Sequence, residues 1–276
     1  MNKILTLYNI EFKRIYKLYF ALIGMLFLGN LAGLAISIKN SVKEISMDNK
    51  LPMNISILKT NTGYEFVNTF TVKDIYIYIY GTIALGIAVL MCLLYALIIW
   101  YRDYYSRRKT IYTLLCLPQS RFNIYLSKLI TIVVMIYGTI VSQFVFWYIN
   151  LTIVKNLAGI QSPIFLNIFK NMMHSVRIPN IVSPNIVEFL MVDIIGVILA
   201  VVVIFTAVLI ERSVKKVGVI LGPLYISLAI FGYLYLFKFS RLLLLNLLTI
   251  HIGYYTFLFM ISLLLSYYIM NKKISI

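Results

Sequence analysis

Long apolar stretches separated by short polar segments make up most of the chain. A helix needs about 20 residues to cross the roughly 30 Å hydrocarbon core of a bilayer. Six stretches are long enough: residues 18–38, 75–100, 124–149, 186–210, 217–237 and 243–270. This pattern predicts an all-α polytopic membrane protein with six transmembrane helices in one domain spanning residues 1–276.

Two stretches depart from a simple helical pattern. Residues 75–80 alternate isoleucine and tyrosine as a β-strand would, yet they lead directly into an apolar stretch, so tyrosines at the membrane interface of a helix explain them better. The last stretch is long for one span and is interrupted at 251–253. We expect a short outer helix over residues 241–250 that dips into the membrane, followed by a span over 254–270.

The first 17 residues have the period of an amphipathic helix. Polar side chains recur at three- and four-residue steps, with apolar side chains between them: Asn2, Thr6, Asn9, Lys13 and Lys17. A basic interfacial helix of this kind is expected to lie flat on the inner membrane surface. The alternative is that residues 1–17 extend the first span inward.

Two long polar segments, residues 39–74 and 155–185, are predicted outer loops. Within the second, the apolar residues of 164–177 fall on one helical face. We expect a helix there on the outer surface, serving either as a lid over a pathway or as a packing cap.

Composition and charge agree with a membrane protein. The chain is 62% hydrophobic and 12% charged, whereas about a quarter of the residues of soluble domains are charged. With the N-terminus inside, the inner segments hold fifteen of the 25 Lys and Arg residues, which predicts a multi-pass plasma-membrane protein with both termini cytoplasmic. The net charge of +16 indicates anionic membrane lipids as partners and not nucleic acid, since no basic and aromatic surface remains outside the spans.

The chain lacks the motifs of several enzyme classes. It has no Gly-x-x-x-x-Gly-Lys-Ser/Thr run, no His-Glu-x-x-His, no Cys-x-x-Cys and no Gly-x-Ser-x-Gly. We expect no catalytic residue, no metal site and no cofactor bound by this chain. An ATP-driven function would require a separate subunit.

Three ionisable side chains in the apolar stretches are candidates for a substrate pathway, because such groups are costly in a bilayer and often functional: Glu188, Asp193 and His251. Glu188 and Asp193 lie about 140° apart on a helix, so they do not form a paired site. Glu188 lies either in the pathway or at the headgroup level, and Asp193 either contacts a neighbouring helix or lines a cavity.

Two pairs of glycines have the spacing that lets helices approach closely: Gly29 and Gly33, and Gly218 and Gly222. We expect both pairs to serve helix packing, with a dimer seam as the alternative for the first. Pro223 is expected to kink the fifth helix near its inner end.

The segment between the second and third stretches has the most specific pattern. A basic cluster is followed by a short apolar run, a Leu-Pro pair, a Ser-Arg pair and a Ser-Lys pair: Arg107, Arg108, Lys109, Thr110, Ile111, Tyr112, Thr113, Leu114, Leu115, Leu117, Pro118, Ser120, Arg121, Ser127 and Lys128. This order resembles the ABC type-2 export permeases, which commonly show Gly-Thr, leucines, Leu-Pro, Ser-Arg and Gly-Lys here. Ser127 replaces the last glycine, and the usual acidic residue before Gly-Thr is missing, with Asp103 displaced outward.

The resemblance implies a cytoplasmic coupling helix that docks on a separate ABC ATPase subunit, which would bind ATP and Mg. The implied coupling residues are Thr110, Ile111, Tyr112, Leu114, Leu115, Leu117, Pro118 and Arg121. It also implies a second permease copy or a homologous permease as partner, because six spans form half a pore.

The function expected from the resemblance is that of a permease subunit of an ATP-driven exporter. Its substrate would be hydrophobic or amphiphilic, such as a peptide, a bacteriocin or an antibiotic, in export or immunity. The alternative is a membrane-embedded enzyme or an ion-coupled secondary transporter that uses Glu188, Asp193 and His251.

Overall fold

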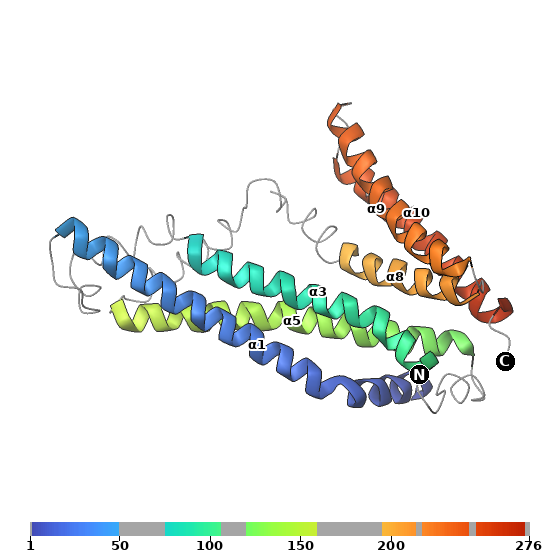
Figure 1. Ribbon diagram of the computed structural model, residues 1–276, viewed down its shortest axis with the longest axis horizontal. Helices are drawn as coiled ribbons and strands as arrows, with labels where there is room; N and C mark the ends of the chain where they lie inside the picture. Colours follow the sequence, from blue (N-terminus) through green and yellow to red (C-terminus); the bar gives the residue numbers. More distant parts are fainter. Residues whose placement is uncertain are drawn as a thin grey trace. The chain divides into compact units, whose positions relative to one another are not determined.

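The computed structural model describes residues 2–49, 75–105, 120–158, 195–213, 217–242 and 247–273. Every element in these ranges is a helix (Figure 1). The helices are α1 (Asn2–Asn49), α3 (Ile75–Tyr105), α5 (Arg121–Ala158), α8 (Gly196–Ser213), α9 (Gly218–Leu242), α10 (Leu247–Tyr268) and the short π-helix η3 (Ile269–Lys273).

Six helices in the described part of the chain are long and apolar enough to cross a membrane: Ile4–Asn40, Ile83–Tyr104, Arg121–Val154, Gly196–Ser213, Gly218–Leu236 and Ile252–Asn271. The predicted all-α fold with six spans is therefore confirmed, and the chain is a multi-pass membrane protein by helix length and hydropathy. Residues 75–80, whose alternation resembles a strand, are helical as expected.

The expected break at 251–253 is wrong, because α10 runs through these residues without interruption. The hydroxyl of Thr256 lies within hydrogen-bond distance of the carbonyl oxygens of Ile252 (2.8 Å) and Gly253 (3.0 Å). A glycine inside a helix costs about 1 kcal/mol. Freeing backbone groups in hydrocarbon costs several kcal/mol each, so the helix continues.

Helix α1 is longer than the first predicted span at both ends. Residues 2–17 are continuous with the span, and the predicted outer loop from residue 39 is helical up to Asn49. Val42 and Ser46 are buried in this extension, so it packs against the protein. The position of residues 1–17 on the inner membrane surface stays a prediction.

Other expectations remain predictions. The helix expected at 164–177 and most of both predicted outer loops lie outside the described residues. Pro223 lies inside α9, near its start, and its kink is likewise still a prediction.

The chain forms two compact units. Unit 1 comprises Met1–Tyr16, Met91–Ile136 and Ser183–Ile276, and unit 2 comprises Lys17–Leu90 and Tyr137–Val182. The long helices α1, α3 and α5 contribute to both.

In unit 2, two glycines of α1 lie directly against α3. A Cβ atom added at Gly33 would lie 2.7 Å from the Cβ atom of Tyr80, and one added at Gly29 would lie 3.4 Å from that of Ala84. The first glycine pair thus serves packing within the chain, as expected, and this contact replaces the alternative of a dimer seam.

A buried pair of amides joins α1 to α5 in the same unit. Asn30 Nδ2 donates to Gln143 Oε1, and Gln143 Nε2 donates to Asn30 Oδ1, both at 2.9 Å. A Cβ atom at Gly81 of α3 would lie 2.8 Å from Gln143 Nε2, so a glycine is needed there. Since a slip of one helix along the other would leave buried amides unpaired, this pair fixes the register of α1 against α5.

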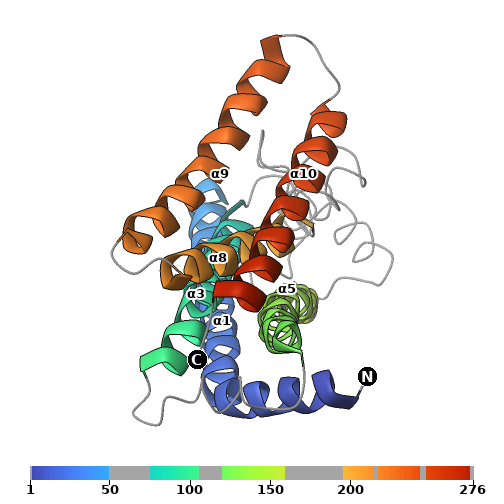
Figure 2. The same ribbon diagram turned by 90° about the vertical axis from the view of Figure 1, so that its right-hand side faces the viewer.

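In unit 1, α8 packs against α9 and α10, which form an antiparallel helical hairpin (Figure 2). A Cβ atom at Gly222 of α9 would lie 2.9 Å from the backbone oxygen of Ala207 of α8. The second glycine pair therefore also serves packing, as predicted.

Buried hydroxyl groups add hydrogen bonds to this packing. The hydroxyl of Thr206 in α8 lies 3.0 Å from that of Ser266 in α10, and the hydroxyl of Tyr225 in α9 lies 2.6 Å from that of Ser262. Such bonds hold helices together where a bilayer provides no hydrophobic driving force between them.

Candidate functional site

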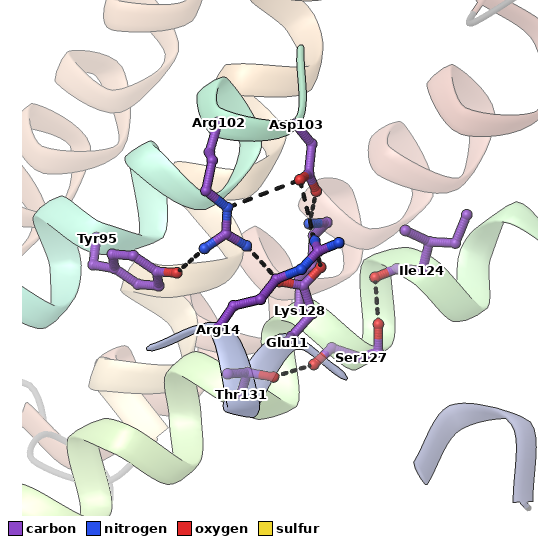
Figure 3. A network of polar contacts seen from close by, with 9 residues as sticks. All are labelled: Glu11, Arg14, Tyr95, Arg102, Asp103, Ile124, Ser127, Lys128 and Thr131. Atoms are coloured by element: carbon purple, nitrogen blue, oxygen red, sulfur yellow. Dashed lines mark hydrogen bonds and ion pairs between the residues drawn. The ribbon is translucent and has the colours of Figure 1, made fainter. Parts of the chain in front are cut away.

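Five charged side chains gather in unit 1, beside the ends of α3 and α5 that flank residues 106–119 (Figure 3). We call them the ion cluster: Glu11 and Arg14 from α1, Arg102 and Asp103 from α3, and Lys128 from α5. Three helices thus meet at one set of charges.

The position of Glu11 follows from the helical repeat of α1. Leu7, Glu11 and Ile15 follow one another at four-residue steps, which places them on one face of the helix. All three are buried. The carboxylate therefore points into the protein, away from the polar face formed by Asn9 and Lys13.

Lys128 is the most deeply buried member, with 0% of its side chain exposed. Its Nζ atom lies 3.1 Å from Glu11 Oε1 and also contacts Asp103 Oδ2. The ring of Trp100 lies 5.4 Å from the same nitrogen, within the range of a cation–π interaction. Both buried carboxylates therefore have a buried cation between them.

Arg102 completes the pairing on the other side of Glu11. Its Nη2 atom donates to Glu11 Oε2 at 2.6 Å, and its Nη1 atom donates to the hydroxyl of Tyr95 at 2.7 Å. Its Nε atom lies 3.9 Å from Asp103 Oδ1. Arg102 thereby links the last turns of α3 to α1.

Arg14 makes the loosest contacts. Its Nη1 atom lies 3.5 Å from Glu11 Oε1 and 3.6 Å from Asp103 Oδ1. Its side chain is 36% exposed, so it lies at the edge of the ion cluster.

Two hydroxyl side chains beside Lys128 bond to the backbone of their own helix, α5. Ser127 Oγ donates to the carbonyl of Ile124 at 2.9 Å, and Thr131 Oγ1 donates to that of Ser127 at 2.8 Å. Ser127 is buried, and this internal bond satisfies its hydroxyl group.

The burial of the charges determines what the ion cluster can do. Removing one partner of a buried ion pair leaves a bare charge and typically costs about 3–5 kcal/mol. Pulling α1 away from α3 and α5 would separate Glu11 from Lys128 and Arg102. The ion cluster is therefore suited to hold three helix segments together.

The end of α3 also contacts α8. Tyr101 donates its hydroxyl hydrogen to Glu211. The guanidinium of Arg212 lies 4.9 Å from the ring centre of Tyr101 and 5.1 Å from that of Tyr104. The last turns of α3 thus contact the ion cluster on one side and α8 on another.

Most of the predicted coupling residues lie outside the described residues: Thr110, Ile111, Tyr112, Leu114, Leu115, Leu117 and Pro118. Arg121 is the first residue of α5. Its Nη1 atom lies 3.5 Å from the backbone oxygen of Met270 in η3, so it contacts the end of the last span.

The substrate pathway expected at Glu188, Asp193 and His251 stays a prediction. Glu188 and Asp193 lie outside the described residues, and His251 is described only as part of the helix α10. Within the described ranges, no three His, Cys, Asp or Glu residues are grouped so that they could hold a metal ion.

Sequence reasoning missed Glu11 as a site residue, and it described Asp103 only as displaced outward from the usual acidic position, with no partner named. One feature of the sequence, the isolation of each acidic residue, could have identified both Glu11 and Asp103. Glu11 is the only acidic residue among the first 43, and Asp103 is the only one between Asp74 and Glu188. A solitary carboxylate in or beside an apolar helix needs a cation, and Lys128 supplies it.

Comparisons with protein-family models, with curated proteins and with solved structures found no match.

Proposed function

We propose that this protein is a permease subunit of an ATP-driven exporter, with both termini cytoplasmic and ATP hydrolysed by a separate subunit. The observation that carries the proposal is the ion cluster. It ties α1 to the two helices that flank residues 106–119. Within this stretch, residues 110–117 have the sequence that resembles a coupling helix. A docking segment can move a permease only if the helices on either side of it are firmly joined to the other helices of the permease.

The proposed mechanism uses two connections from the end of α3. A displacement of residues 106–119 moves α3 and α5 together. Separating Lys128 from Asp103 would leave two buried charges without partners, which is energetically costly. Glu11 carries α1 with these two helices, and the bond from Tyr101 to Glu211 passes the movement to α8. Closure of ATPase subunits would in this way shift several spans at once.

The proposed cargo is a hydrophobic or amphiphilic molecule, such as a peptide, bacteriocin or antibiotic. The spans carry few charges and 22 tyrosines occur in the chain, which suits a ligand with both apolar and polar parts. A second permease copy or a homologous permease would complete the pathway, and this chain would contribute no catalytic group.

The proposal is tested by substituting the apolar residues of the docking segment. Leu114→Asp or Leu115→Asp places a charge where an apolar contact is required, and should abolish recovery of the ATPase with the tagged chain from membranes. Ser106→Asp adds the same charge outside residues 110–117, and should leave recovery intact. Insertion of all three variants is checked by membrane fractionation, and unchanged ATPase recovery with Leu114→Asp would refute the docking assignment.

A second candidate function is that of an ion-coupled carrier. The buried carboxylates of Glu11 and Asp103 favour it, because acidic groups in spans are typical of ion relays. Both carboxylates are paired with cations, which favours a role in holding the helices together over a role in relaying ions. Uptake or efflux driven by an ion gradient in vesicles that contain only this chain would decide for the carrier.

A further inference from the structure

The charges of the ion cluster do not balance. It contains three cations and two anions. Lys128 and Arg102 make the close contacts to Glu11, at 3.1 and 2.6 Å, and Lys128 also contacts Asp103. These four groups balance one another, so the surplus positive charge is that of Arg14.

Arg14 lies where a ligand can reach it. Its side chain is 36% exposed, whereas its near neighbours on the helix, Leu7, Glu11 and Ile15, are buried. The next residue back, Lys13, is exposed as well. Among the described side chains of residues 4–16, the exposed charged groups are thus both basic.

The same turns of α1 also expose apolar side chains. Leu5, Ile10 and Tyr16 of α1 are 57%, 43% and 41% exposed. The span that begins at Ile4 includes all of them. A ligand that satisfies this surface needs an anionic group beside Arg14 and Lys13 and hydrocarbon beside the apolar side chains.

An anionic phospholipid has both parts. A guanidinium binds phosphate oxygens through two parallel N–H donors, and basic residues at an anionic membrane surface attract lipid headgroups. A free phosphate ion would satisfy the charges and leave the apolar side chains without a partner. The chemistry therefore favours the lipid.

We propose that Arg14 and Lys13 form a binding site for the phosphate of an anionic phospholipid. The bound headgroup neutralises the surplus charge of the ion cluster and so stabilises the junction of α1, α3 and α5. This site does not depend on the transport function.

The test measures thermal unfolding of the purified full chain in a neutral detergent. Phosphatidylglycerol should raise the melting temperature in a saturable way, and phosphatidylcholine with the same acyl chains should not. Arg14→Gln should weaken the apparent affinity about five-fold, since a basic residue at such a surface contributes about 1 kcal/mol. Arg14→Lys should keep most of the affinity. Lys39→Gln, which removes an exposed charge elsewhere on α1, should behave as wild type.

Three outcomes would overturn the proposal. They are equal stabilisation by the two lipids, equal affinity in Arg14→Gln and Lys39→Gln, and full stabilisation by inorganic phosphate alone, which would show that no lipid is required. If Arg14→Gln does not fold, Lys13→Gln decides: a several-fold loss of phosphatidylglycerol affinity supports the site, and unchanged affinity refutes it.

Discussion

At the scale of single residues, Lys128 is the side chain on which the ion cluster most depends. Lys128→Met keeps an unbranched apolar stem and removes the charge that lies between Glu11 and Asp103. We expect the free energy of unfolding to fall by about 3–5 kcal/mol, because two buried carboxylates lose a counter-ion. Denaturation in detergent measures this change in the free energy of unfolding.

Lys39→Met is the matched control, because Lys39 is exposed on α1. Exposed substitutions away from special contacts usually change stability by about 0.5 kcal/mol or less. Equal stabilities of Lys128→Met and Lys39→Met would contradict the ion cluster as described.

The hydroxyl of Tyr101 provides a second test at this scale. Tyr101→Phe removes the hydrogen bond to Glu211 and keeps the ring beside Arg212. Hydrogen bonds to charged groups contribute about 1.5–3 kcal/mol, so stability should fall by about this amount. Tyr267→Phe, at an exposed tyrosine, serves as control, and a similar small effect of both changes would argue against the contact with α8.

Long sequence separation explains why these contacts could not be predicted from the sequence. Glu11 is separated from Arg102 by 91 positions and from Lys128 by 117. Periodicity places a residue on a face of its own helix, but it carries no information on which distant helix that face meets. From the sequence alone the basic residues therefore indicate only topology, although three of them are ion-pair partners: Arg14, Arg102 and Lys128.

At the scale of elements, the glycines of α1 make a clear prediction. Gly33→Val would place a Cβ atom 2.7 Å from that of Tyr80 and force α1 away from α3. Overpacking of this kind typically costs about 1–3 kcal/mol. A Cβ atom at Gly24 meets no atom within 4 Å, so Gly24→Val should be tolerated. Midpoints of unfolding in SDS compare the two, and equal midpoints would contradict the packing of α1 on α3.

The six spans could be predicted because a span has to satisfy two requirements, length and apolarity, that are visible in sequence. The ends of the helices and the interruptions within them could not be predicted from the sequence. α10 continues through Gly253 and α1 continues to Asn49, since backbone hydrogen bonds outweigh weak local signals such as one glycine or a polar residue. The coupling segment, residues 110–117, remains a sequence-based expectation.

At the scale of the whole molecule, the distribution of basic residues predicts both termini on the cytoplasmic side. In a chain with Cys92 and Cys116 replaced by serine, a membrane-impermeant thiol reagent added to intact cells should label Asn61→Cys in the predicted outer loop. Lys3→Cys should react only after the cells are opened. Labelling of Lys3→Cys in intact cells would reverse the proposed topology.

We propose that energy from ATP hydrolysis on another subunit enters this chain through the segment between α3 and α5. The most direct measurement is ATP hydrolysis in the complex captured on the tagged full chain from native membranes. The account predicts Mg-dependent hydrolysis that co-elutes with the wild-type chain and with Ser106→Asp, and that is lost with Leu114→Asp. A chain that elutes without ATPase activity, yet moves a solute in response to an ion gradient, would contradict it.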